Sequence, residues 1–375
     1  EQHEKLFHNK ANGFSYTRIN NPTILAFENR MTALEHGLSS VACASGMAAL
    51  TNAFLNILQS GDEIVSSAGL YGGSIDLFRD LEAFGITTKY VETNNWEQIE
   101  AAIGEHTKLI FAETIANPGL TVTDIEKMSE IAHDHGVPLV VDNTTATPYL
   151  IRVLKHGADI VVNSSSKYMN GSSNAISGIL TDGGKFKWDK IKYPGMSDYV
   201  KYGPMAFVAK LRNGIFRHTG ACLSPVNAYL NLIGIETLGL RMERECQNAL
   251  ELAHWIAKNY SDIIVNYPGL ESSSWHNVAK EQFEHGYGAI LTLRVGSKEK
   301  AFKFIDSLTI PYIISNIGDT KTLVLHPAST ISLHSTDKEK EDAGVYEDLI
   351  RVSVGIEDIE DLKDDFAQAF SKIRD

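Results

Sequence analysis

Short apolar runs alternate with helical segments through the middle of this sequence, from about residue 47 to residue 163. The runs are continuous rather than alternating in polarity, and the clearest are 63–65, 109–112, 138–141 and 160–162. A strand that is apolar on both faces is typical of a parallel sheet that helices cover on both sides. This pattern predicts an α/β fold built on a mostly parallel sheet.

The length of the chain, 375 residues, exceeds what a single hydrophobic core usually organises, so we expect more than one domain. Residues 1–20 are polar and show no helical or strand periodicity, which predicts an N-terminal arm that packs on something else. We place the α/β domain at 21–220 and a smaller α+β domain at 221–375. A final helix is predicted by an apolar stripe with helical spacing, at Ile359, Leu362, Phe366, Phe370 and Ile373.

Charge and cysteine content argue against several classes of partner. The net charge is −13 and no cluster of Lys and Arg interrupts it, so we expect neither nucleic acid nor an anionic membrane as partner. Three cysteines without CxxC spacing argue against a disulfide framework or a zinc site, and we expect no bound metal. No apolar run approaches the roughly 18 residues needed to span a bilayer, and the first five residues do not resemble a secretion signal. The expected location is the cytoplasm.

Polar residues follow three successive apolar strands. Asn117, Asp142 and Lys167 come after these strands, and the carboxyl ends of neighbouring parallel strands share one crevice. The trio fits the chemistry of pyridoxal 5'-phosphate (PLP). A lysine binds this cofactor as a Schiff base, a carboxylate keeps the pyridine nitrogen protonated, and a neutral amide donates to the ring hydroxyl. Taken alone, Asp142 is typical of a turn and Lys167 of a solvated surface, so the interpretation depends on their conjunction.

A turn of small residues at 44–49 opens a helix and is a candidate binding site for the phosphate group of such a cofactor. Free backbone N–H groups and the helix dipole face an anion in this kind of turn, which makes Ser45, Gly46 and Met47 candidates. Ser164 and Ser166 add hydroxyl groups beside the lysine. The alternatives are a tight helix start without a ligand and a merely polar turn.

Three further side chains are candidates for the same site. Tyr71 follows a turn after an apolar run and could stack on a planar ring, although tyrosine is often core or surface filler. Arg351 stands in an apolar run, where its charge needs either a substrate carboxylate or an internal salt bridge. Arg18 lies in the polar arm, where the alternative is a solvated residue.

Together, these segments resemble the Cys/Met-metabolism family of PLP-dependent enzymes over nearly the whole chain. In this order and spacing they are highly specific as a set. The segments that carry the resemblance are Tyr16–Arg18 with Asn21–Thr23, Ala44–Ala49, Val141–Thr144 with Thr147–Leu150, Ser164–Lys167, Glu236–Leu238 with Leu240–Arg244, His326–Ser329 and Arg351–Glu357.

The resemblance implies a fold type I, aspartate-aminotransferase-like enzyme with a mixed, mostly parallel sheet and a smaller α+β C-terminal domain. It implies that Lys167 forms the Schiff base with PLP, that Asp142 faces the pyridine nitrogen, and that Tyr71 stacks on the ring. The residues that it places around the phosphate are Ser45, Gly46, Met47, Ser164 and Ser166.

The resemblance also implies a shared active site. Arg351 would bind the substrate carboxylate, with Asn316 nearby. Tyr16 and Arg18 would reach the phosphate of a neighbouring subunit, which implies a homodimer that usually assembles into a tetramer. An arm without a core of its own is consistent with this arrangement.

Within the family, three segments resemble the O-acetylhomoserine sulfhydrylases: 267–270, 320–323 and 315–319, in which Asn316 replaces the serine usual in lyases and cystathionine γ-synthases. Gly73 stands where methionine γ-lyases usually have cysteine. The resemblance therefore predicts γ-replacement on O-acetyl-L-homoserine by sulfide or methanethiol, which gives L-homocysteine or L-methionine plus acetate. The alternatives within the family are a γ-elimination lyase, for methionine or cystathionine, and a cystathionine γ-synthase.

The sequence also departs from the family and leaves other classes open. Asn163 and Ser172 stand where the family usually has histidine. Ser164 and Lys167 match the S-x-x-K motif of acyl-serine enzymes, but the companion motifs Ser-Asp-Asn and Lys-Thr-Gly are absent from the sequence. A binding or scaffold protein on the same fold is a further alternative, against which the retention of Lys167, Asp142 and Arg351 argues.

Overall fold

The computed structural model describes residues 1–7, 11 and 13–374. Seven strands form the larger sheet in the order β1-β7-β6-β5-β4-β2-β3. Their bounds are β1 (Ser39–Cys43), β2 (Glu63–Ser67), β3 (Thr87–Val91), β4 (Thr107–Glu113), β5 (Leu139–Asp142), β6 (Ile160–Asn163) and β7 (Gly178–Asp182). Strands β3, β2, β4, β5 and β6 run parallel, whereas β7 is antiparallel to both β6 and β1. The predicted mixed, mostly parallel sheet is confirmed.

Both faces of the central strands β4, β5 and β6 are buried, as their continuous apolar runs predict, whereas the edge strand β3 is mostly exposed. Along β5, Val140 packs in one hydrophobic cluster and its neighbour Val141 packs in the other. The helices whose side chains join the Val140 cluster are α3 (Gly46–Ile57), α4 (Gly72–Glu82), α8 (Ala206–Asn213) and α9 (Ile215–Thr219). Those on the Val141 side include α2 (Pro22–Glu35), α5 (Trp96–Ala102), α6 (Ile125–Asp134) and α7 (Thr147–Leu150).

A second sheet of five strands has the order β10-β11-β12-β9-β8. The strands are β8 (Ile264–Asn266), β9 (Ile290–Arg294), β10 (Tyr312–Ile313), β11 (Leu323–Leu325) and β12 (Leu349–Ser353). Three helices pack their apolar sides into its core, namely α11 (Leu238–Asn259), α13 (Lys298–Ile305) and α15 (Ile359–Arg374). The predicted final helix is therefore confirmed, with Leu362, Phe366, Phe370 and Ile373 buried.

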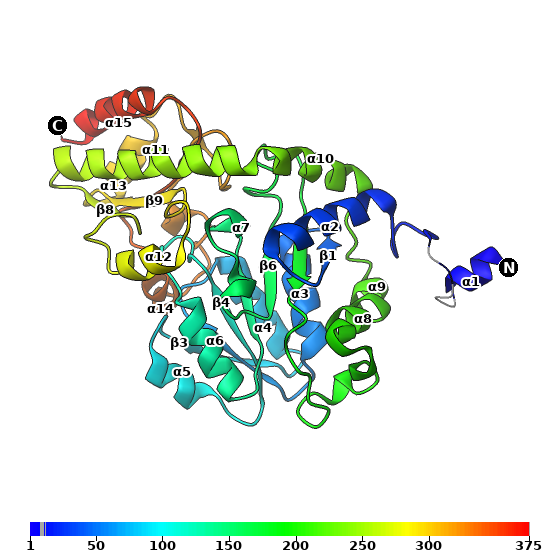
Figure 1. Ribbon diagram of the computed structural model, residues 1–375. Helices are drawn as coiled ribbons and strands as arrows, with labels where there is room; N and C mark the ends of the chain where they lie inside the picture. Colours follow the sequence, from blue (N-terminus) through cyan, green and yellow to red (C-terminus); the bar gives the residue numbers. More distant parts are fainter. Residues whose placement is uncertain (8–10, 12, 375) are drawn as a thin grey trace.

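The remaining elements connect these two layers. Figure 1 shows α10 (Pro225–Glu236) and α11 running end to end across the top of the molecule. The short elements are α12 (His276–Gln282), α14 (Asp337–Asp342) and 3₁₀ turns at Val153–Lys155, Pro194–Met196, Val200–Met205 and Pro327–Ser329. Among the helices of the described residues, none has both the length and the apolar character that crossing a membrane requires.

The N-terminal arm contains one element that the sequence pattern did not predict. Residues Gln2–Phe7 form the short helix α1, which Figure 1 shows standing apart from the two sheets. An ion pair joins Lys5 to Glu1, one helical turn away, and is consistent with this helix. The helix was not predicted because the segment has no apolar stripe with helical spacing. Part of the arm, residues 8–10 and 12, lies outside the described residues. The division into 1–20, 21–220 and 221–375 stays a prediction.

Candidate active site

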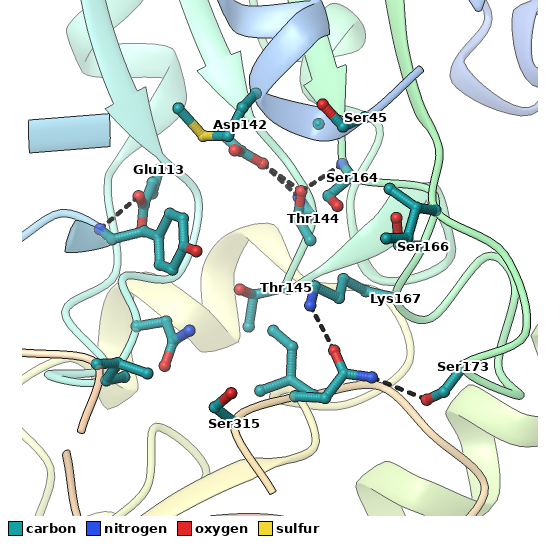
Figure 2. Close-up of a pocket in the computed structure, with 18 of the residues that line it drawn as sticks. Ser45, Glu113, Asp142, Thr144, Thr145, Ser164, Ser166, Lys167, Ser173 and Ser315 are labelled. Carbon is teal, nitrogen blue, oxygen red and sulfur yellow. Dashed lines mark hydrogen bonds between the residues drawn. The ribbon is translucent and has the colours of Figure 1, made fainter. Parts of the chain in front are cut away.

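One pocket lies at the carboxyl ends of the central strands. Strands β4, β5 and β6 are neighbours, and Glu113 at the end of β4 pairs in register with Asp142 at the end of β5. The cavity there has a volume of about 560 Å³. Its lining includes every predicted site residue except Tyr16 and Arg18, namely Ser45, Gly46, Met47, Tyr71, Asn117, Asp142, Ser164, Ser166, Lys167, Asn316 and Arg351. Figure 2 labels five of them, Ser45, Asp142, Ser164, Ser166 and Lys167. The structure therefore brings together residues that the sequence separates by more than 300 positions.

Lys167 presents its amino group to this pocket from the turn that follows β6. Its Nζ donates a hydrogen bond to Oδ1 of Asn316, and Asn316 Nδ2 in turn donates to Oγ of Ser173 at 2.8 Å. Burial, together with the nearby charge of Arg351, lowers the pKa of Lys167 to about 8. A larger fraction of the amine is therefore neutral near physiological pH than for a surface lysine, which favours attack on an aldehyde.

Asp142 has one carboxylate oxygen fixed by its own strand end. Its Oδ1 accepts hydrogen bonds from the backbone N–H of Thr144 at 2.9 Å and from its hydroxyl at 2.5 Å. Oδ2 has no hydrogen-bond partner among the residues that the structure describes. Burial raises the pKa of Asp142, although the two hydrogen bonds from Thr144 oppose this effect. An adjacent protonated ring nitrogen would supply a charged donor to the free oxygen.

Glu113 places a second carboxyl group beside Asp142. Its Oε1 accepts the backbone N–H of Tyr71 at 2.8 Å, where α4 begins. Burial, and then the charge of Asp142, raise the pKa of Glu113 to about 8. With Asp142 ionised, Glu113 is therefore predominantly protonated near neutral pH, because two buried like charges disfavour each other.

Arg351 carries a buried charge without an anionic partner. Its side chain extends from β12, and the residue is only 3% exposed. The guanidinium donates to Oδ1 of Asn117 at 3.1 Å and to the backbone oxygen of Asn316 at 2.9 Å, and its buried Nε has no hydrogen-bond partner within residues 1–7, 11 and 13–374. No Asp or Glu of the described residues forms an ion pair with it, so the internal salt bridge considered above is not found. Burial lowers its pKa to about 10, and the charge is available to a carboxylate.

The start of α3 has the form of an anion cradle. Ser45 is the N-cap, and its Oγ accepts the N–H of Ala48 at 3.0 Å. A Cβ atom at Gly46 would lie 2.6 Å from Cβ of Ser164, so only glycine allows the loop after β6 to approach this helix so closely. Ser166 is less available, because its hydroxyl donates to the backbone oxygen of Ser177 at 3.0 Å.

These residues fit PLP. The pocket contains an amine for the aldehyde, a partly buried carboxylate with one free oxygen for the ring nitrogen, and a helix start for the phosphate. Tyr71 lines the same cavity and is 43% exposed, which leaves its ring free to contact a ligand. The individual roles of the predicted site residues remain predictions.

Three residues of the site were not predicted from the sequence. Glu113 ends an apolar strand just as Asp142 does, so the same signal could have identified it. Thr144 links two parts of the site, because its Oγ1 donates to Asp142 and accepts the N–H of Ser164 at 2.8 Å. Its position two residues after the carboxylate was a weak signal. Ser173 contacts Asn316, which is 143 positions away in the sequence, and no sequence signal pointed to this contact.

The fold and the pocket define a PLP-dependent enzyme of fold type I. The model of the family described as "Cys/Met metabolism PLP-dependent enzyme" matches residues 1–371. The chain belongs to this family, which confirms the resemblance described above.

Individual relatives agree with this membership. The chain is 42% identical over 380 residues to the homocysteine synthase of Schizosaccharomyces pombe, with 97% of this chain and 89% of the relative covered. It is similar to the solved structure of an O-acetylhomoserine sulfhydrylase from Wolinella succinogenes, with a TM-score of 0.83, 40% identity and 96% and 100% of the two chains covered. A Campylobacter jejuni crystal structure with N'-pyridoxyl-lysine-5'-monophosphate matches with a TM-score of 0.91, 33% identity and coverage of 99% and 91%. PLP is thus the cofactor of this enzyme.

Proposed function

We propose that this protein is a transferase that catalyses γ-replacement on O-acetyl-L-homoserine. Sulfide or methanethiol would replace the acetoxy group at Cγ, which gives L-homocysteine or L-methionine plus acetate, a step of methionine biosynthesis. The observation that carries the proposal is the position of Asn316. Its side chain contacts Lys167 and its backbone oxygen contacts Arg351, so the residue that distinguishes the sulfhydrylase-like segment lies between the two principal cations of the pocket. The names of the relatives support the same reaction.

Lys167, Asp142 and the start of α3 would hold the cofactor. When bound, PLP supplies an electron-accepting ring that stabilises negative charge at Cα of an attached amino acid. Asp142 would keep the ring nitrogen protonated through its free Oδ2, while Thr144 fixes the orientation of the carboxylate. Asn117 accepts from Arg351 through Oδ1, which leaves its amide N–H groups free to donate to the ring hydroxyl.

Arg351 would bind the α-carboxylate of the substrate and orient Cα toward Lys167. A planar guanidinium with a partnerless Nε suits two parallel hydrogen bonds to a carboxylate. Lys167 would remove a proton from Cα of the bound substrate with Nζ. A second proton would leave Cβ as acetate departs from Cγ with the electrons of the Cγ–O bond. The sulfur of the thiol would then bond to Cγ, and Cβ and Cα would each regain a proton. Burial raises the pKa of Tyr71, so its phenol stays protonated and can assist these transfers as a donor.

The oligomeric state and the location belong to the proposal as well. We propose a homodimer with shared active sites, assembled into a tetramer, in the cytoplasm. Tyr16 is 59% exposed and is not part of the pocket of its own chain. Arg18 donates to the backbone oxygen of Arg217 at 2.6 Å. Both residues would therefore serve the phosphate of a neighbouring subunit.

A product assay tests the reaction. Purified enzyme loaded with PLP is incubated with O-acetyl-L-homoserine and sulfide, and homocysteine and acetate are measured in equal amounts. Parallel reactions with O-succinyl-L-homoserine, with methanethiol and with cysteine as the thiol distinguish the sulfhydrylase from a cystathionine γ-synthase. A reaction without thiol that releases ammonia and 2-oxobutanoate at a comparable rate would identify a γ-lyase instead. Absence both of homocysteine with sulfide and of methionine with methanethiol would contradict the proposal.

A further inference from the structure

A chain of hydrogen bonds continues from the pocket into the loop that follows Lys167. Lys167 Nζ donates to Asn316 Oδ1, Asn316 Nδ2 donates to Ser173 Oγ, and the Ser173 hydroxyl donates to Asp319 Oδ2. The other oxygen of Asp319 accepts from the backbone N–H of Lys321 at 3.0 Å and from its Nζ at 3.2 Å. Each link of this chain joins a group that donates to a group that accepts.

The carboxylate at the end of this chain determines the direction of every bond in it. Burial works to raise the pKa of Asp319, but hydrogen bonds from Ser173 and Lys321 lower it overall, so Asp319 is ionised and can only accept. Because the single proton of the Ser173 hydroxyl points to Asp319, Ser173 can only accept from Asn316. The amide of Asn316 must then turn its NH₂ group to Ser173 and its oxygen to Lys167.

We propose that Ser173 and Asp319 are positioning residues that hold the amide of Asn316 with its oxygen toward Lys167. The two ends of an amide have nearly the same shape, so steric fit alone does not select one orientation. An oxygen beside the lysine nitrogen favours the protonated nitrogen, whereas an NH₂ group would disfavour it. The inference rests on the proposed role of Lys167 as the residue that binds the cofactor aldehyde.

The conformation of Ser173 supports a specific role. Its φ is 54°, in the left-handed region that favours glycine, so a serine here adopts a strained backbone. A glycine would relieve that strain and remove the CH₂OH side chain, and with it the hydroxyl group. Substitution with glycine therefore separates the hydrogen bond from the stability of the fold.

Other charges also influence the lysine nitrogen. The titratable and charged side chains that share the pocket with Lys167 are Tyr71, Glu113, Asp142 and Arg351. Ser173 and Asp319 hydrogen-bond to none of these four in the described part of the chain. A change at position 173 or 319 therefore leaves these groups in place and acts on Lys167 through Asn316.

The test is a pH titration of the visible absorbance of the lysine–cofactor adduct in the purified holoenzyme, without substrate. In Ser173→Gly the amide is free to rotate, and the apparent pKa of the adduct is expected to fall by about one pH unit. In Asp319→Asn the new NH₂ group donates to the hydroxyl oxygen of Ser173. The Ser173 hydroxyl must then donate to Asn316. The amide of Asn316 therefore turns its oxygen to Ser173 and its NH₂ group to Lys167. The expected fall is larger than in Ser173→Gly. Ser172→Ala, at an exposed neighbour, should titrate as the wild type.

The outcomes separate this inference from the proposed function. If Ser173→Gly and Asp319→Asn fold, form the adduct and titrate as the wild type does, the positioning role is wrong while the cofactor assignment stands. A wild-type protein that forms no adduct would overturn both. Thermal denaturation of the three variants identifies a misfolded one, and Ser173→Gly is expected to be at least as stable as the wild type.

Discussion

Lys167 and Asn316 are hydrogen-bonded to each other although they lie in loops that connect strands of different sheets. Lys167 follows β6 of the seven-stranded sheet, and Asn316 lies between β10 and β11 of the five-stranded sheet. The backbone oxygen of Asn316 also accepts from Arg351 on β12. The site is therefore complete only when the two sheets are packed together. A substitution where the two sheets pack against each other should alter catalysis even if the substituted residue does not contact the cofactor.

Replacement of the lysine is the most direct test of the site. Lys167→Ala should lose covalent cofactor binding and its visible absorbance, and the turnover number should fall by at least about 10³-fold. Absorbance spectra before and after borohydride treatment, together with the product assay, measure both effects. Lys187→Ala, at an exposed lysine, is the matched control and should behave as the wild type. Normal turnover in Lys167→Ala would show that another residue binds the cofactor.

A change at Arg351 should affect substrate binding more than the chemical step. Arg351→Lys keeps the positive charge but loses the planar pair of donors, so kcat/KM should fall by roughly 10²-fold, mainly through a higher KM. Steady-state kinetics with O-acetyl-L-homoserine measure the effect. Arg30→Lys, in an exposed ion pair with Glu236, is the control. An unchanged KM would argue against carboxylate binding by Arg351.

A methyl group at position 46 should damage the phosphate cradle. In Gly46→Ala the new Cβ would lie 2.6 Å from Cβ of Ser164, so the loop before Lys167 must move away from α3. We expect PLP affinity to fall by about tenfold or more, which a fluorescence titration of the apoenzyme measures. Gly104→Ala meets no atom closer than 3.9 Å and should bind PLP normally. Equal affinities for the two variants would mean that the cofactor phosphate lies elsewhere.

A buried acid behind the active site should make stability depend on pH. Asn163 donates to Oε1 of Glu35 at 2.7 Å, while Glu35 Oε2 and Asn163 Oδ1 have no hydrogen-bond partner in the described part of the chain. Burial raises the pKa of Glu35 to about 8, despite the hydrogen bond from Asn163. The folded protein therefore keeps a proton that the unfolded chain releases above about pH 4.3. Stability should fall as pH rises between these two values, by up to about 1.4 kcal/mol per pH unit.

Glu35→Gln should remove this contribution. The glutamine amide can donate to Asn163 Oδ1 and accept from its Nδ2, at every pH. Thermal denaturation of both proteins from about pH 5 to about pH 8 should show that the stability of the variant relative to that of the wild type increases as pH rises. Glu105→Gln, at a side chain that is 87% exposed, provides the comparison. Parallel curves for wild type and Glu35→Gln would mean that Glu35 is ionised in the folded state.

The sequence predicted those features that depend on local pattern. Asp142 was identifiable because an unbroken apolar strand ends at it, and the same logic placed Asn117 and Lys167 beside it. The absence of an ion partner for Arg351 could not be predicted, because it depends on which acidic residues the tertiary fold keeps away. The contact of Ser173 with Asp319 spans 146 positions, from the loop between β6 and β7 to the loop between β10 and β11, and no local pattern encodes it. Family resemblance supplied the role of Asn316 but not its two contacts.

The register between β4 and β5 sets Glu113 opposite Asp142. Since successive residues of a strand point to opposite faces of a sheet, a slip of one position would turn one of these side chains away from the other. The fraction of chains that bind one PLP then measures the fraction of molecules whose central strands are paired in the correct register. Cofactor stoichiometry would serve as a quality test for refolded or engineered preparations, even before any substrate is added.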